Sequence, residues 1–218
     1  MLAYTAEAAL AARRLQRVVL STDSEEIAQV GLQYGLDVPF LRPPELAKDD
    51  TPTVPVLQDV VRRLELTGEF YDAVFLLQPT NPLRSASDID GAVELFESTG
   101  ADSVISFVDA GEKHPARMKF IDTGGRVLDP SFAEEFEGQP RQQLPKLFLR
   151  EGSVYLTRMD VLMKQGSLKG HDCRAWIMPR ERACNIDDEF DLFLAEQMLR
   201  YRHEQHQHTD LRVERLFA

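Results

Sequence analysis

The sequence predicts an α/β fold: a Rossmann-like, mostly parallel sheet with helices on both faces and an inserted subdomain. Three observations support this class. Short apolar runs alternate with amphipathic helical segments through residues 1–108. The run 73–77 is apolar at every position, as expected of a strand buried on both faces. The alternation stops at Asp109 and resumes at Ser153, which indicates an insertion.

The individual elements follow from periodicity and capping residues. The Ala-rich segment at the start of the chain is a good helix former. The apolar run after it ends at Ser21-Thr22-Asp23-Ser24, residue types that begin helices, and Glu25 and Glu26 suit the positive helix end. The expected helices span residues 4–15, 25–34, 54–66, 88–98, 158–164 and 188–202, and the expected strands span 17–20, 73–77, 103–108, 153–156 and 175–178.

These elements divide the chain into three parts. Residues 1–108 and 151–202 form one α/β domain. Residues 109–150 are irregular and contain several Pro and Gly, so we expect a subdomain with short antiparallel strands around 118–121. Residues 203–218 are polar and are expected to form a loosely held tail.

Composition excludes several classes of function. The chain has 218 residues, 43% hydrophobic and 28% charged, and a net charge of −11. Such acidity disfavours nucleic-acid binding, so an anionic substrate would need local cations or a metal ion. Cys173 and Cys184 do not form a CxxC motif, which favours reduced thiols and a cytoplasmic location. No apolar run is long enough to span a membrane.

Three polar clusters fall where ligands bind in open parallel sheets, beyond the carboxyl ends of strands. They are Ser21-Thr22-Asp23, Gln78-Pro79-Thr80-Asn81 and Asn185-Ile186-Asp187. Two prolines stiffen the second cluster, so its amide and hydroxyl groups could hold a base or a sugar. The same residues could equally form a turn and cap before the next helix.

The third cluster could bind Mg²⁺. Asp187 precedes the expected helix, and Mg²⁺ commonly takes one or two carboxylates together with substrate phosphates. Asp188, Glu189 and Asp191 are better explained as helix-start residues that favour the dipole. Asp187 remains open between the two interpretations.

The insertion carries cations that could hold a carboxylate substrate or simply form a solvated face. They are Lys113, His114, Lys119 and Arg141, with Gln142 and Gln143 beside the last. The histidines at 203, 206 and 208 lack carboxylates at ligand spacing and are poor metal candidates. Neither GxGxxG nor GxxxxGK[ST] occurs, so a dinucleotide fold and a P-loop kinase gain no support.

Read together, these segments resemble the acylneuraminate cytidylyltransferases, also called CMP-sialic acid synthetases. The resemblance runs in order from Tyr4 to Leu199. It is carried by Arg17-Val-Val-Leu-Ser-Thr-Asp23, Phe40-Leu-Arg-Pro-Pro-Glu-Leu-Ala47, Gln78-Pro-Thr-Asn-Pro-Leu-Arg84, Arg141-Gln142, Gly152-Ser-Val-Tyr155 and Ile186-Asp187.

The resemblance implies transfer of CMP from CTP to the anomeric hydroxyl of an acidic nine-carbon sugar, with release of pyrophosphate. It also implies Mg²⁺ dependence and a homodimer joined through residues 109–150, which would form a dimerisation and sugar-binding subdomain. Carried over by position, Ser21, Gln78, Thr80 and Asn81 would serve the nucleotide, Lys119, Arg141, Gln142 and Tyr155 the sugar, and Asp187 with Asn185 the metal and catalysis.

Three departures from the family pattern bear on activity. Met1 matches the helix that follows the family's first strand and triphosphate loop, so roughly 25 residues would be absent. That strand would lie centrally in the sheet, and without it neighbouring strands would keep unpaired backbone groups. Asn185 stands where many members have Asp, and Glu151 replaces a common Asn and could repel an anionic sugar.

Two alternatives therefore stay beside the enzyme hypothesis. The chain could be an inactive remnant that keeps only a dimer or sugar-binding surface. It could also be a nucleotidyltransferase that uses another nucleoside triphosphate.

Overall fold

The computed structural model describes the backbone of residues 1–214, and the side chains of these residues except 203 and 205–214. The helices are α1 (Leu2–Ala11), α2 (Glu25–Gln33), α3 (Thr53–Leu66), α4 (Ala86–Thr99), α5 (Met159–Gln165) and α6 (Glu189–Glu214). The strands are β1 (Ala73–Leu76), β2 (Ser103–Asp109), β3 (Phe120–Ile121), β4 (Val127–Leu128), β5 (Phe148–Arg158) and β6 (Cys173–Ile177). Among these residues no helix is both long and apolar enough to cross a membrane.

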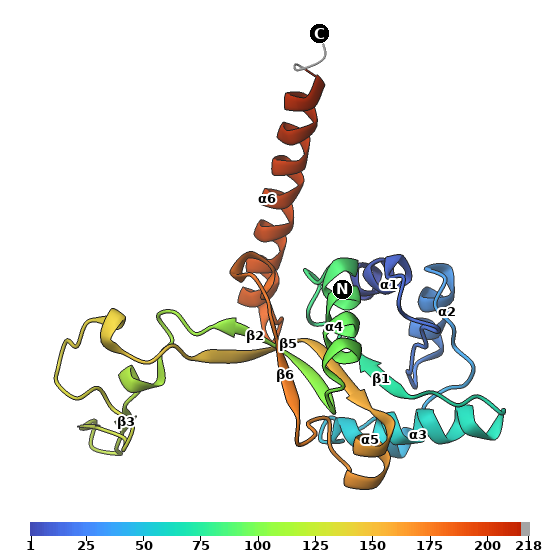
Figure 1. The fold of residues 1–218 in the computed structure, drawn as a ribbon, viewed down its shortest axis with the longest axis horizontal. Coiled ribbons are helices and arrows are strands. Elements are labelled where there is room, and N and C mark those ends of the chain that lie inside the picture. The colour runs from blue at the N-terminus through green and yellow to red at the C-terminus, as the bar shows by residue number, and fades with distance from the viewer. Residues whose placement is uncertain (215–218) are drawn as a thin grey trace.

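The central sheet has the strand order β1-β5-β2-β6 and is mostly parallel, as predicted. β2 and β6 pair in parallel, whereas β5 pairs antiparallel with both β1 and β2. β1, β2 and β6 therefore point the same way, and only β5 is reversed. Helices α1 and α4 lie on one side of the sheet and α3 and α5 on the other (Figure 1).

The core lies between α4 and the sheet. Ala92, Val104, Val154 and Leu156 are at most 4% exposed and form one cluster, against which Trp176 packs. A second cluster joins α1 to α4 through Ala8, Ala9 and Ile89. α4 begins at Ser85 with a capping box, in which the Ser85 and Asp88 side chains each bond the other residue's backbone N–H. These contacts fix α4, and with it the loop that precedes it.

The expected strand at 17–20 does not join the sheet. Val19 forms only an isolated parallel bridge with Asp37. A groove of about 660 Å³ separates this segment from β1 and is lined mainly by apolar side chains. Its lining includes Ala6, Val18, Val60, Leu64, Phe75 and Leu156.

β1 is consequently an edge strand. Met159 N–H donates to Asp72 C=O (2.8 Å). This bond fixes which residues of β1 direct their backbone groups toward β5. In an antiparallel pair alternate residues bond the partner, so Val74 and Leu76 face β5. Ala73 and Phe75 turn their backbone groups toward the groove, where they meet no hydrogen-bond partner among residues 1–214.

Two elements project from this body (Figure 1). Residues 110–147 form an arm between β2 and β5, and it contains the short β3–β4 pair that was expected near 118–121. β2 and β5 each run slightly further into the insertion than the boundary at 109–150 implies. α6 runs to Glu214, further than the helix end expected at residue 202. The side chains of His203, His206 and His208 lie outside the described residues.

Candidate functional site

Two of the three polar clusters are in direct contact. Ile186 N–H donates to Thr80 C=O (2.9 Å), and the Asn81 amide nitrogen donates to Cys184 C=O (3.1 Å). Ser21 and Pro79 both line the groove between residues 18–20 and β1. The turn after β1 therefore contacts the third cluster, and its Pro79 lines the same groove as Ser21.

Arg84 holds the turn after β1 in shape. Its side chain is 3% exposed and donates to Gln78 C=O (2.8 Å) and to Ser153 C=O (2.6 Å). Burial lowers its pKa to about 10, although the carboxylates of Glu151 and Asp88 act in the opposite direction. One guanidinium nitrogen, Nη1, has no partner among the described residues. Arg84 thus ties the Gln78 turn to β5.

Asn81 is the central contact of the site. It is 1% exposed, and its amide nitrogen donates to Glu151 C=O and to Cys184 C=O, both at 3.1 Å. Because both partners are acceptors, the orientation of the amide is fixed. Its Oδ1 and the Gln78 side-chain oxygen both lie close to the position that a Cβ of Gly152 would occupy. Gly152 has a φ of 98°, a conformation suited to glycine.

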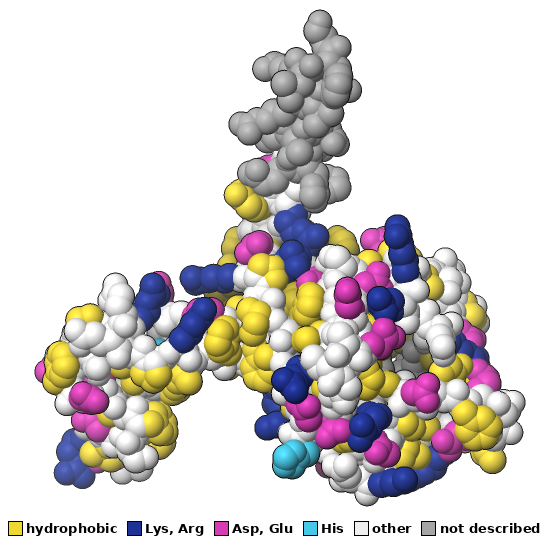
Figure 2. All heavy atoms as spheres, viewed as in Figure 1, with side chains coloured by type: hydrophobic (Ala, Val, Ile, Leu, Met, Phe, Trp, Pro, Cys, Tyr) yellow, Lys and Arg dark blue, Asp and Glu magenta, His cyan; other side chains and the backbone are white. Residues whose placement is uncertain are grey.

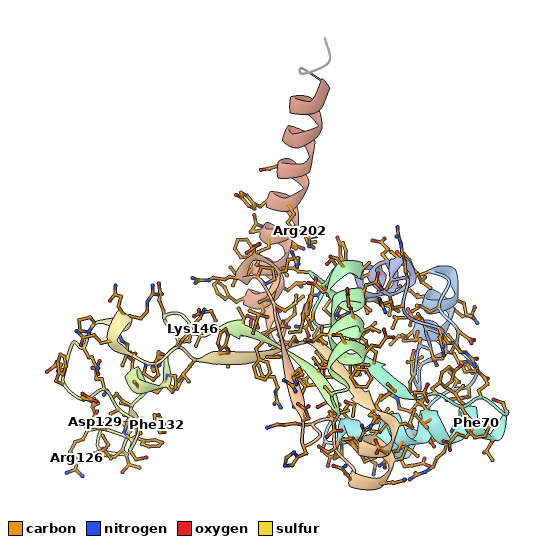
Figure 3. All side chains as sticks on the ribbon, in the orientation of Figure 1. Phe70, Arg126, Asp129, Phe132, Lys146 and Arg202 are labelled. Carbon is orange, nitrogen blue, oxygen red and sulfur yellow. The ribbon has the colours of Figure 1, made fainter. Side chains whose placement is uncertain are left out.

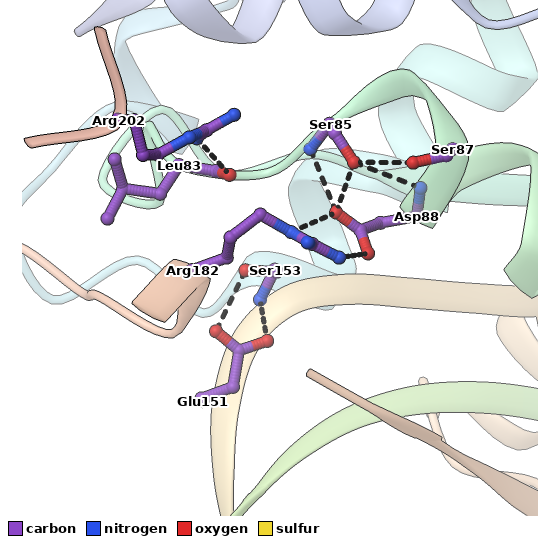
Figure 4. Close-up of polar contacts among 8 residues, drawn as sticks. All are labelled: Leu83, Ser85, Ser87, Asp88, Glu151, Ser153, Arg182 and Arg202. Atoms are coloured by element: carbon purple, nitrogen blue, oxygen red, sulfur yellow. Dashed lines mark hydrogen bonds and ion pairs between the residues drawn. The ribbon is translucent and has the colours of Figure 1, made fainter. Parts of the chain in front are cut away.

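A buried ion pair connects α4 to the segment before α6 (Figure 4). Arg182 donates through Nη2 to Asp88 Oδ1 (2.6 Å) and through Nε to Asp88 Oδ2 (3.1 Å). Asp88 is 1% exposed. Burial acts to raise the pKa of Asp88, but hydrogen bonds from Arg182 and Ser85 outweigh burial and hold it below its usual value.

The candidate metal residues lie just before α6. Asp187 is exposed, and its Oδ2 accepts a hydrogen bond from Asn185 Nδ2 (2.7 Å). Asp191 accepts from the Asp187 N–H (3.0 Å) and Asp188 accepts from the Asp191 N–H (2.9 Å), which supports the helix-start interpretation of these two residues. No group of three or more His, Cys, Asp or Glu suited to a metal occurs in the described part of the chain.

Ser21 is held by a cation. Its hydroxyl accepts from Arg42 Nε (3.1 Å), and Arg42 Nη2 also donates to the Ser21 C=O. Arg42 thus supplies a positive charge at the mouth of the groove. The sequence interpretation had assigned no role to Arg42, although it lies in the matched stretch 40–47.

The predicted sugar-binding residues divide into two groups. Tyr155 is half-buried in β5 and pairs with Leu76, two residues before Gln78. Lys119, Arg141 and Gln142 are exposed on the arm, and Lys119 Nζ pairs with Asp129 Oδ1 (2.5 Å). Figure 3 shows Asp129 toward the outer part of the arm, away from the body. Within one chain, the structure does not bring Lys119 near the three turns.

Two further predictions concern residues near these groups. Glu151 does not project freely: its carboxylate accepts from the Ser153 N–H (2.9 Å) and hydroxyl (2.8 Å). His114 is buried, accepting from Ala116 N–H and lying 3.0 Å from Pro145 C=O, so its environment is structural. Both cysteines are free thiols.

Three arginines matter more than sequence reasoning recognised: Arg42, Arg84 and Arg182. Arg84 ends the polar turn. A cation so close to the start of the helix at residue 86 is only a weak sequence indication of a structural role. The sequence gave no indication of a role for Arg182, because its partner Asp88 lies 94 residues away in the chain.

Comparisons with known proteins identify the family of this chain. A sequence profile of the family described as cytidylyltransferase matches residues 1–128. The chain is 30% identical over 200 residues to the CMP-N,N'-diacetyllegionaminic acid synthase of Legionella pneumophila, covering 91% of this chain and 84% of that protein. It is 29% identical over 193 residues to an N-acylneuraminate cytidylyltransferase of Streptococcus agalactiae, covering 88% and 45%.

The fold is also found in a solved structure. CMP:2-keto-3-deoxy-manno-octonic acid synthetase complexed with CTP superposes with a TM-score of 0.63 at 15% identity, covering 92% of this chain and 88% of that one. This likeness concerns the fold alone. The profile and the sequence relatives confirm the resemblance seen in the sequence: the chain belongs to the cytidylyltransferase family.

Proposed function

We propose that this protein transfers CMP from CTP to the anomeric hydroxyl of a nonulosonic, sialic-type acid and releases pyrophosphate. The anomeric oxygen attacks the α-phosphorus, the bond to the β-phosphate oxygen breaks, and the hydroxyl proton is lost. The observation that carries the proposal is the junction of the Gln78–Asn81 turn with the Asn185–Asp187 segment. Family membership and relatives named for CMP-sugar synthesis support it.

In this proposal the residues act mainly by positioning. Ser21, Gln78, Thr80 and Asn81 orient the nucleotide, and Arg42 adds positive charge beside Ser21. Tyr155, which pairs with Leu76 in the strand before this turn, would contact the sugar. No covalent nucleophile is needed, since orientation and electrostatics carry most of this class of catalysis.

Mg²⁺ is part of the proposal. The exposed Asp187 carboxylate, with the Asn185 amide beside it, fits an ion that takes few protein ligands and several from substrate phosphates. Asp187 and Asn185 would hold it, and when bound it would offset charge on the leaving pyrophosphate.

We further propose a homodimer formed through the arm, in the cytoplasm. The arm exposes many large apolar side chains: Met118, Phe120, Ile121, Val127, Phe132 and Phe136 are each more than half exposed. Figure 2 shows apolar side chains along the arm and at its base. Apolar surface of this extent is typical of protein interfaces. In a dimer, Lys119, Arg141 and Gln142 could serve the partner's sugar site.

Pyrophosphate release tests the proposal. The protein is incubated with CTP, Mg²⁺ and each of N-acetylneuraminic, legionaminic and pseudaminic acids. Turnover with one sugar is expected, and Asp187→Ala should abolish it. Absence of turnover with every nonulosonic acid would overturn the proposal. Sugar binding without CTP binding would indicate a remnant, and a preference for GTP would indicate a different nucleotidyltransferase.

A further inference from the structure

The segment 179–188 has little regular structure of its own. Between β6 and α6 it contains only a short 3-10 helix, Arg180–Arg182. Yet it carries the proposed metal residues Asn185 and Asp187. What holds this segment therefore decides where the Asp187 carboxylate lies.

Few contacts hold it against the Gln78 turn. The Ile186 N–H bonds Thr80 C=O, and Cys184 C=O accepts from Asn81. Beyond the segment, Arg202 Nη1 of α6 donates to Leu83 C=O (3.1 Å). The strongest tie is the ion pair of Arg182 with Asp88, which makes two charge-assisted hydrogen bonds to a carboxylate that is 1% exposed (Figure 4).

Asp88 is a firm anchor. It belongs to the capping box of α4, and the next residue, Ile89, is fully buried in the core. Arg182 is only five residues from Asp187. The rigid start of α4 is thereby connected, through one side chain, to the position of the proposed metal ligand.

We propose that Arg182 is a positioning residue: its fork-shaped contact with Asp88 sets the location of Asn185 and Asp187 relative to the Gln78 turn. This proposal rests on the proposed function in assigning a purpose to that location. Arg182 donates to both carboxylate oxygens of Asp88, so a positive charge alone would not reproduce this contact. Lys can supply one point charge but cannot make the same two-point contact.

Amide hydrogen exchange on Arg182→Met, Arg182→Lys and the unmutated protein gives a direct test. Protection of the Ile186 amide should fall in Arg182→Met and partly recover in Arg182→Lys. Arg174→Met is the control, because Arg174 also pairs with an aspartate, Asp172, but lies at the other end of β6. It should leave Ile186 unchanged.

Mn²⁺ binding in the presence of CTP, followed by electron paramagnetic resonance, gives a second readout. The dissociation constant should rise by about tenfold in Arg182→Met, the lower end of the range for residues that orient metal ligands. Unchanged Ile186 protection and unchanged Mn²⁺ affinity, with only a lower melting temperature, would overturn the proposal. Failure of the proposed function would instead appear as no pyrophosphate release by the unmutated protein, and the exchange measurement does not depend on turnover.

Discussion

Replacing Gly152 with Ala should damage stability and the site together. Gly152 has a φ of 98°, where an L side chain costs about 1–3 kcal/mol. An added Cβ would lie 3.1 Å from Gln78 Oε1 and 3.2 Å from Asn81 Oδ1. Gln78 can swing aside, but Asn81 is held by two hydrogen bonds, each contributing about 0.5–1.5 kcal/mol. We expect a total loss of about 2–4 kcal/mol.

For a chain of this size, that loss corresponds to a melting temperature lower by about 4–16 °C. Denaturant titration measures the free energy of unfolding, and initial rates measure KM for CTP and for the sugar. KM should rise, because Gln78 and Asn81 both shift. The matched control is Gly166→Ala, which has a φ of 62° and no atom within 4 Å of the added Cβ.

The control should lose only the cost of the left-handed backbone, about 1–2 kcal/mol, with unchanged KM. Equal losses in the two variants, together with unchanged kinetics in Gly152→Ala, would refute the reasoning. They would show that the Gln78 and Asn81 side chains do not press on this position.

Three other variants test separate contacts. Asp88→Asn should lower the free energy of unfolding by about 3–5 kcal/mol at pH 7, because it breaks a buried ion pair. The folded pKa of Asp88 is lowered, so its stabilisation is present above the unfolded pKa and is lost as pH falls through the folded pKa. Denaturation curves for variant and wild type should therefore converge at acid pH. Asn81→Asp should lower the melting temperature more than Asn81→Ala, because it places carboxylate oxygens against the carbonyls of Glu151 and Cys184; the reverse order in thermal scans would contradict this. Asn185→Asp should lower the melting temperature in EDTA, because it replaces a hydrogen-bond donor to Asp187 with a like charge. Adding Mg²⁺ with CTP should restore the melting temperature. A melting temperature insensitive to Mg²⁺ would argue against the proposed metal site.

Sequence patterns predicted most elements because local signals specify them. The apolar run 73–77 marked β1, and the helix expected at 88–98 lies within α4. The direction of β5 was not predictable, because an apolar run reads the same in a parallel or antiparallel strand. The segment 17–20 has the composition of a strand, but pairing requires a neighbour, and its only bridge is to Asp37.

The sequence indicated the candidate loops but not the contacts that support them. Ser21, Gln78 and Asp187 were selected because polar residues follow apolar runs or lie between such a run and a helix. Arg182 and Asp88 were not paired in advance, since a contact between residues 94 positions apart depends on how α4 and the segment before α6 pack. The separation of Lys119 from the body likewise depends on the direction of the arm.

The unsatisfied side of β1 has a consequence for handling this protein. Backbone groups of Ala73 and Phe75, which meet no hydrogen-bond partner in the described part of the chain, form a template on which an extended segment from another molecule can assemble. The groove beside them offers apolar side chains for that segment to cover. The protein should accordingly become prone to aggregate as its concentration rises, with the first intermolecular contacts at this edge.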